Sequence, residues 1–286
     1  MRARANVPYF FVLPALIFFL VVCVLPMLYA LGLAFFSENY GQFSWCGIQN
    51  FTALAQDSEF KQAMINTVFY ALITIPAGLV ISLFFAVILD SGIRWTAFWR
   101  TVFFSPSVTT PAAIGYIWLW MYQPRGGLFT HFFESLGLSG ISFLNNPDTA
   151  LICVALVRIW IFLGFQTVIF LAGLQAIPAE VYEASRVDGA SALRRFIHIT
   201  LPLLNPTIVF LAVIGTIKTL QMFTEVYIMT EGGPLGSTMT IVYLIQQTAF
   251  SSYSKGYAAA MTAVLFFLIL VFTVIQMKFL SRRVEY

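Results

Sequence analysis

Long apolar stretches separated by short polar segments dominate the pattern along this chain. A helix needs about 20 mostly apolar residues to cross the hydrocarbon core of a bilayer. Stretches of this length lie at about 9–34, 64–89, 101–122, 149–173, 207–229 and 256–280. A chain in lipid must satisfy its own backbone hydrogen bonds, and the short alternating segments of a β-barrel are missing. The pattern therefore predicts an all-α membrane protein with six transmembrane helices.

The first apolar stretch resembles a signal peptide only at its start. Arg2 and Arg4 precede it, but the apolar run continues from about Tyr9 to Phe36. The core of a signal peptide spans roughly 7–15 residues and ends at a cleavage site. We therefore expect this stretch to be retained as the first span.

Composition supports a membrane protein and excludes several other classes. Hydrophobic residues make up 60% of the 286 residues and charged residues only 9%, whereas roughly a quarter of an average soluble domain is charged. The net charge of +3 is too small and scattered to indicate nucleic-acid binding. The cysteines, Cys23, Cys46 and Cys153, lack metal-ligand spacing. With no internal repeat, a single membrane domain is expected over residues 1–286.

Basic residues predict the orientation of the spans, because Lys and Arg gather in cytoplasmic loops. With the N-terminus in the cytoplasm, ten basic residues fall on the cytoplasmic side and three, Lys61, Arg125 and Lys255, on the outer side. Both termini are therefore expected in the cytoplasm. The ten are Arg2, Arg4, Arg94, Arg100, Arg186, Arg194, Arg195, Lys278, Arg282 and Arg283.

The longest predicted cytoplasmic connection, residues 174–206, has the composition of an ordered elbow. Pro178 suits the first turn of a helix, and Glu180 and Glu183 complement its positive N-terminal end. Asp188-Gly189 then ends this helix. A helix–turn–helix with glycine at the bend is predicted.

The second helix of the elbow begins after Ser191, which can cap its N-terminus. Leu201-Pro202 is expected to end this helix, and Asn205-Pro206 leads into the fifth span.

The elbow carries a motif at fixed spacing. Glu183-Ala184-Ser185, then Gly189, then Ile199-Thr200-Leu201-Pro202 resemble the EAA loop, E-A-A-x3-G-x9-I-x-L-P, of binding-protein-dependent ABC importer permeases. Ser185 departs from the pattern by replacing the second alanine. The chain further resembles the first permease subunit of the sugar-permease branch, which includes maltose-type and glycerol-3-phosphate-type importers. This resemblance lies in residues 164–165, 171–178 and 229–234.

This resemblance implies the type I permease fold and a coupling helix that docks on a cytoplasmic ATPase. Glu183 and Ala184 would lie on the docking surface, and Gly189 would allow the bend. Three arginines would be free for polar contacts with the ATPase: Arg186, Arg194 and Arg195. The alternative is a solvated amphipathic loop whose arginines only follow the positive-inside rule.

The partners follow from the same resemblance. They are a second homologous permease that forms a heterodimer with this chain, two ATPase subunits and an extracytoplasmic solute-binding protein. The expected location is the cytoplasmic (inner) membrane, with multiple passes through the lipid.

Polar residues within the fifth span suggest a solute path, because charges at membrane depth are expensive. Lys218, Gln221 and Glu225 fall on one face of a continuous helix. Lys218 and Glu225 would then lie roughly 10 Å apart along the axis, too far for direct pairing. A hydroxyl-rich solute or a polar neighbouring helix could bridge them.

Polar and aromatic residues of the third and fourth spans extend this candidate path. Arg158 and Gln166 lie eight residues apart on the fourth span, and Tyr116 lies with Trp118 and Trp120 near the end of the third. Sugars bind through such mixtures of amides, charges and aromatic faces. The alternative is a polar cluster that holds helices together, with the tryptophans in the interfacial belt.

The sequence lacks motifs for catalysis or nucleotide binding. There is no G-x-x-x-x-G-K-[ST] phosphate loop, and His131 and His198 lie far apart without metal-ligand companions. We therefore expect a transport subunit without cofactor or metal, which carries a carbohydrate while a separate subunit hydrolyses ATP. The alternatives are a glycerol-3-phosphate permease of the same class and an ion-coupled secondary transporter that uses Glu225.

Overall fold

A computed structural model describes residues 7–39, 41–92, 94–138 and 140–280. Arg2, Arg4, Arg282 and Arg283, which contribute to the predicted orientation, lie outside these residues. The chain divides into two compact units, residues 1–58 with 244–267 and residues 59–243 with 268–286. Each unit is described by itself.

The described residues contain four helices that are long and apolar enough to cross a membrane. These are Phe11–Leu33, Ser58–Asp90, Pro147–Gln175 and Lys255–Leu280. They correspond to the predicted first, second, fourth and sixth spans. Two bent pairs of helices raise the total to six if each pair forms one span.

The first unit begins with an apolar helical segment and a small hairpin. Helix α1 (Val7–Phe19), a π-helical turn (Leu20–Val24) and α2 (Leu25–Leu33) form the first span, whose most apolar window has no residue buried in the protein. Strands β1 (Phe36–Asn39) and β2 (Gln42–Trp45) pair antiparallel. Helix α3 (Gln49–Gln56), a π-helical turn (Gln247–Ser251) and the start of α15 (Lys255–Leu280) complete the unit. The sequence pattern does not predict the hairpin.

Side-chain hydrogen bonds anchor the hairpin within this unit. The Asn50 amide donates to the carbonyls of Ala34 and Phe36, at 2.8 and 2.9 Å. Glu38 accepts from the backbone N–H of Lys255 at 3.1 Å and from its ammonium at 3.5 Å. The connection after the first span is therefore an ordered structure attached to the beginning of α15.

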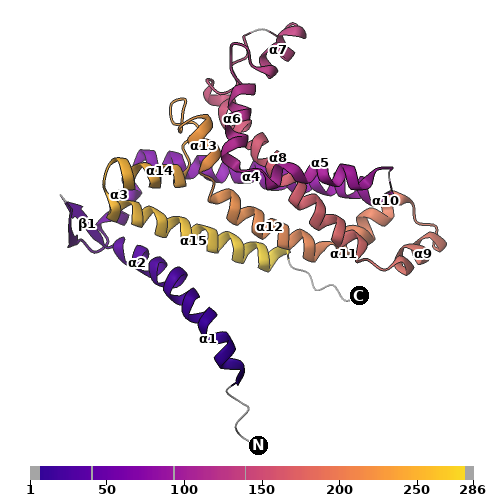
Figure 1. Cartoon of the computed structure of the whole chain (residues 1–286), viewed down its shortest axis with the longest axis horizontal. Coiled ribbons are helices and arrows are strands. Elements are labelled where there is room, and N and C mark those ends of the chain that lie inside the picture. The colour runs from indigo at the N-terminus through magenta and orange to yellow at the C-terminus, as the bar shows by residue number, and fades with distance from the viewer. Residues whose placement is uncertain (1–6, 40, 93, 139, 281–286) are drawn as a thin grey trace, which may run out of the picture. The chain divides into compact units, whose positions relative to one another are not determined.

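The second unit is built around one long helix, α8 (Pro147–Gln175), which contributes to both buried clusters of the unit. One cluster joins α8 to α6 and α13, and the other joins it to the end of α4 and the start of α12. Figure 1 shows these helices. Their bounds are α4 (Ser58–Asp90), α5 (Thr96–Val108), α6 (Pro111–Met121), α7 (Leu128–Ser135), α12 (Asn205–Leu220), α13 (Thr224–Met229) and α14 (Ile241–Gln246).

The predicted third span, at about 101–122, is not one straight helix. It consists of α5 and α6, which meet at an angle of 98°. Pro111 has no N–H to continue a helical ladder, and Thr110 before it takes an extended backbone with φ −60° and ψ 131°. Pro111 is therefore the first residue of a new helix.

The prediction that the fifth span, at about 207–229, is one continuous helix is wrong. Helix α12 ends at Leu220, and α13 begins at Thr224. Phe223 between them leaves the helical region, with φ −136° and ψ −54°. The predicted polar residues of this span lie on both sides of the break.

Candidate functional sites in the elbow and in the broken fifth span

The elbow forms as predicted and ends its first helix with a defined motif. Helix α9 (Ala179–Val187) is followed by Gly189, whose φ of 74° lies in the left-handed region. The N–H of Ala190 donates to the Ser185 carbonyl, and the N–H of Gly189 donates to the Arg186 carbonyl, each at 3.0 Å. This pair of bonds is the Schellman motif, which favours glycine at this position. The fixed place of Gly189 thus has a local physical cause.

The second arm of the elbow begins at Ser191. The Ser191 hydroxyl accepts from the backbone N–H of Arg194 at 3.4 Å and caps α10 (Ala192–Arg195). A π-helical turn (Phe196–Thr200) and α11 (Leu201–Leu203) continue the arm. The helix therefore runs one residue past Leu201-Pro202 and bends by 64° before α12.

The elbow presents a mixed exposed surface. Glu183, Ala184 and Arg186 on α9, and Arg194 on the second arm, are exposed. Val187 and Leu193 are exposed apolar side chains, at 88% and 68%. Figure 1 shows α9 and α10 together at one end of this unit. This surface provides the charged and apolar groups that a docking partner would contact.

Several motif residues instead face the protein. Ser185 is buried, and its hydroxyl donates to the Tyr182 carbonyl at 2.7 Å. Thr200, also buried, lies 3.2 Å from the Tyr182 hydroxyl. Ile199 and Leu201 are half-buried, while Pro202 is exposed. The small residue at position 185 is therefore explained by packing between the two arms.

One of the three arginines expected to be free has a partner within the elbow. The Arg195 guanidinium donates to the Ala190 carbonyl at 3.2 Å, and the residue is half-buried. This bond ties the second arm to the bend, because Ala190 follows Gly189 directly. Arg195 therefore has a structural role inside the elbow, beside the contact with the ATPase that the resemblance predicts for it.

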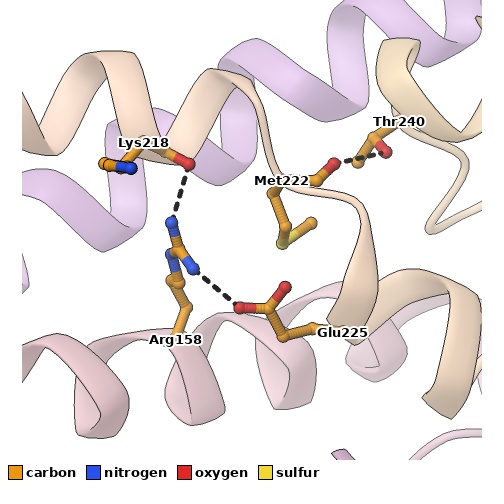
Figure 2. A network of polar contacts seen from close by, with 5 residues as sticks. All are labelled: Arg158, Lys218, Met222, Glu225 and Thr240. Atoms are coloured by element: carbon orange, nitrogen blue, oxygen red, sulfur yellow. Dashed lines mark hydrogen bonds and ion pairs between the residues drawn. The ribbon is translucent and has the colours of Figure 1, made fainter. Parts of the chain in front are cut away.

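Arg158 is the centre of a second site, at the break in the fifth span. Its Nη1 donates to Oε1 of Glu225 at 2.8 Å, and its Nη2 donates to the Lys218 carbonyl at 2.7 Å (Figure 2). The Glu225 side chain is 2% exposed and that of Arg158 11%. One guanidinium of α8 thus binds both halves of the broken span.

The position of each partner explains why the arginine binds there. Lys218 lies in the last turn of α12, where carbonyls lack helical partners and carry partial negative charge. Glu225 lies in the first turn of α13, where a carboxylate is favoured. On the opposite side of the break, the Thr240 hydroxyl donates to the Met222 carbonyl at 3.3 Å (Figure 2). Side chains from elsewhere in the chain therefore bind two backbone carbonyls at the break, those of Lys218 and Met222.

The break changes the predicted arrangement of the fifth span. Lys218, Gln221 and Glu225 do not share one helical face, since the helix ends between them. Gln221 is exposed, whereas Glu225 is buried against Arg158. Arg158 of the neighbouring helix α8 links Glu225 to the backbone carbonyl of Lys218, and not to the Lys218 ammonium.

Gln166 forms part of the helix packing. Its side-chain carbonyl accepts from the Ser82 hydroxyl at 3.0 Å, and Gly78 leaves room for the amide. Arg158 and Gln166 line the same cavity, but its volume is only about 10 Å³. A cavity of this size holds at most one water, so these two side chains do not enclose space for a solute here.

The aromatic residues of α6 separate into two groups. Tyr116 and Trp120 are exposed at 63% and 56%. Trp118 packs against Tyr122 and Trp160 at ring-centroid distances of 5.6 Å. Tyr116 is therefore accessible to a partner or solute, whereas Trp118 belongs to the core.

Sequence reasoning did not identify several residues around the break. Tyr70 is fully buried in the same cluster as Met222 and Val226, and its hydroxyl has no hydrogen-bond partner within the described part of the chain. Phe162 lies one turn from Arg158, and its ring centroid is 4.4 Å from the guanidinium carbon. The i, i+4 spacing from Arg158 could have pointed to Phe162; no sequence signal pointed to Tyr70.

The loop after α13 is held in place from α4. The Asn66 amide donates to the carbonyls of Gly236 and Met239, at 2.8 and 2.9 Å. Burial, followed by the nearby Glu231 charge, raises the pKa of Tyr243 above its ordinary value. The two Asn66 hydrogen bonds order the loop that places Thr240 beside the break.

Residues 51–286 match the family described as binding-protein-dependent transport system inner membrane component. The chain is 31% identical over 282 residues to the sn-glycerol-3-phosphate transport system permease protein UgpA of Salmonella typhimurium LT2. The alignment covers 98% of this chain and 95% of the relative. The chain is 33% identical over 280 residues to the probable ABC transporter permease protein YurN of Bacillus subtilis 168, with 96% and 95% covered.

Two solved structures share the fold. One is a bacterial ABC transporter involved in import of the acidic polysaccharide alginate, with a TM-score of 0.86, 22% identity, and 99% of this chain and 97% of that chain covered. The other is a bacterial alginate ABC transporter in complex with its alginate pentasaccharide-bound periplasmic protein. Its TM-score is 0.84 and its identity 23%, with 96% and 93% covered.

Proposed function

This chain belongs to the family of binding-protein-dependent transport system inner membrane components, and we propose that its cargo is a carbohydrate whose import is driven by separate ATPase subunits. Its family membership makes it a multi-pass inner-membrane permease subunit of an ABC importer. The observation that carries the proposal is the exposed EAA elbow within a chain related to sugar-branch permeases along nearly its whole length.

The proposed assembly contains this chain, a second homologous permease, two ATPases and an external solute-binding protein. The exposed side chains of Glu183, Ala184, Val187 and Leu193 support docking of an ATPase on the elbow. Both termini then lie in the cytoplasm, in agreement with the basic residues of the loops. Closure of the ATPases shifts the spans only insofar as the elbow packs differently against their open and closed forms.

The proposed path for the cargo passes the break in the fifth span. Broken helices at membrane depth expose backbone and polar groups that can bind a solute, as in other transporters. Lys218, Gln221 and Tyr116 have exposed side chains that support this role. We propose that three further residues support the structure around the path without contacting the cargo, because their polar groups bind other parts of the chain. They are Arg158, Glu225 and Gln166.

Glycerol-3-phosphate remains the second candidate cargo. Relatives at 31–32% identity are named for sn-glycerol-3-phosphate transport, and Lys218 supplies a cation near the break. An ion-coupled secondary transporter receives less support from the geometry. Its coupling carboxylate would be Glu225, which is buried in an ion pair with Arg158.

The test is ATP-dependent uptake into vesicles that contain the whole complex, with wild type compared to Glu183→Lys. We expect the variant to insert normally but to lose ATPase co-purification and at least about tenfold of uptake, a difference of roughly 1.4 kcal/mol in coupling. Glu134→Lys reverses a charge on exposed α7 and serves as the matched control, with uptake unchanged. Full transport by Glu183→Lys would disprove docking at this surface.

A further inference from the structure

A pocket of about 260 Å³ lies between α5, α8 and α12, next to the polar site. Its walls include the rings of Phe104, Phe162 and Phe165, and its polar groups come from Ser107 and Lys218. Small-molecule sites are mostly apolar and have a few placed polar groups, at volumes of roughly 300–1,000 Å³. This pocket therefore suits a small solute or one end of a longer solute.

The charges around this pocket do not balance. Arg158 and Glu225 neutralise each other at 2.8 Å, and Arg158 binds only the backbone carbonyl of Lys218. Figure 2 shows the Lys218 side chain directed away from that guanidinium. Across the part of the chain that the structure describes, no hydrogen bond or ion pair reaches the Lys218 ammonium. Two cations and one carboxylate leave one positive charge, and it lies at the pocket.

We propose that Lys218 makes this pocket the binding place for an anionic group of the cargo, a carboxylate or a phosphate. The inference rests on the proposed function and narrows its cargo to acidic sugars and sugar or polyol phosphates. A cation within a span is costly unless it has a partner. Aromatic walls strengthen its attraction for an anion, because charges interact more strongly at low dielectric. The phenylalanine faces meanwhile contact the C–H groups of the same solute.

The division of tasks between the two cations follows from their partners. Arg158 is a positioning residue, since its guanidinium is used by Glu225 and by the end of α12. Lys218 is the specificity-determining residue, because its ammonium remains available to the cargo. The ring of Phe162 has Arg158 against it and also lines the pocket. The ion pair thus fixes the wall and the backbone from which Lys218 extends.

The first experiment measures the charge preference of the pocket in the assembled complex. In a cysteine-free background, Ser107→Cys places a thiol in the pocket wall, and its reaction rates with sulfonate-bearing and trimethylammonium-bearing methanethiosulfonates are compared. We expect Lys218→Met to lower the ratio of anionic to cationic rate on the order of tenfold, and Lys218→Arg to preserve it. Ser135→Cys on exposed α7 is the control, whose ratio is unaffected by Lys218→Met.

The second experiment identifies the anionic group through protection of Ser107→Cys from the sulfonate reagent. Galacturonate and glycerol 3-phosphate are compared with galactose and glycerol at equal concentration and ionic strength. Protection by galacturonate indicates a carboxylate, and protection by glycerol 3-phosphate indicates a phosphate. Each is expected to disappear in Lys218→Met.

Two results would overturn the proposal: a rate ratio unchanged by Lys218→Met, or equal protection by the charged and neutral solutes. An unchanged ratio would mean that the ammonium is neutralised in the complex, for example by a carboxylate of the second permease. Co-purification of the ATPase tests the importer assignment separately from the pocket. ATPase co-purification is expected to survive Lys218→Met and to be lost only in Glu183→Lys.

Discussion

Arg158 shows how much one residue at membrane depth can determine. Its guanidinium binds a carboxylate, a helix-end carbonyl and an aromatic face. The sequence shows that such an arginine needs partners, because an unpaired charge in a span is costly. It does not show which partners, since Glu225 lies 67 residues away and faces Arg158 only after the fifth span breaks.

Replacing Arg158 alone is expected to destabilise the protein strongly. Arg158→Leu leaves the Glu225 carboxylate buried at 2% exposure without its partner. Loss of one member of a buried ion pair costs about 3–5 kcal/mol. Thermal unfolding of the purified permease complex in detergent measures the loss, and Leu156→Ala, an exposed position on the same helix, is the control.

The double variant Arg158→Leu with Glu225→Leu separates the buried charge from the helix packing. It is expected to recover most of the stability lost in the single variant, since an apolar pair can replace a buried ion pair with little loss. A double variant as unstable as the single one would show that the contact of Arg158 with the end of α12 dominates.

At the scale of the elements, the hydropathy pattern located the spans but not their continuity. The bend between α5 and α6 has a sequence signal in Pro111, which starts the second helix. The break at residues 221–223 contains neither glycine nor proline. It is stabilised by Arg158 and Thr240, which come from distant parts of the chain. Such tertiary support cannot be recognised from local residue types.

Close packing of α5 on α8 depends on the absence of a side chain at Gly164. An added Cβ would overlap the Phe103 carbonyl oxygen and lie 2.6 Å from the Phe104 Cα. Because both obstacles are backbone atoms, Gly164→Ala is expected to lower stability by about 2–3 kcal/mol, as overpacking does. Gly215→Ala is the control, since its nearest neighbours lie at 3.9 Å and alanine favours the helix by up to about 1 kcal/mol. Equal melting temperatures for the two variants would contradict this packing.

The bend of the elbow depends on a left-handed residue. Gly189→Ala places a Cβ at φ 74°, which costs about 1–2 kcal/mol. Gly189→Asn is expected to be tolerated better, because asparagine also occurs at this position of helix ends. ATPase co-purification is expected to weaken roughly tenfold for alanine and less for asparagine. An identical effect of the two substitutions would show that the left-handed conformation is not what docking requires.

At the scale of the whole molecule, the class of protein was predictable and its internal contacts were not. Six apolar stretches, few charges and the elbow motif predicted a permease, and the family match confirms it. The elbow was predictable in detail because Gly189 and Ser191 act through neighbouring residues. The predicted arrangement of polar residues on one face of the fifth span was wrong, because it assumed a continuous helix. The end of α12 determines which way the side chains of Lys218, Gln221 and Glu225 face and what they contact.

The energy source of transport follows from how the whole molecule uses its buried charges. A proton-coupled carrier needs a carboxylate that alternates between protonated and charged states during transport. Glu225 is unsuited to this role, because its carboxylate is buried and the Arg158 guanidinium already holds it at 2.8 Å. An importer whose elbow docks on an ATPase instead takes its energy from ATP, through closure of the ATPase subunits. Uptake is therefore expected to continue in the presence of an uncoupler and to stop when ATP is depleted.

Glu225→Gln is expected to reduce uptake through lost stability while leaving this dependence on ATP unchanged. Two results would return Glu225 to a coupling role: a shift of the variant to uncoupler sensitivity, or loss of wild-type uptake with the uncoupler alone.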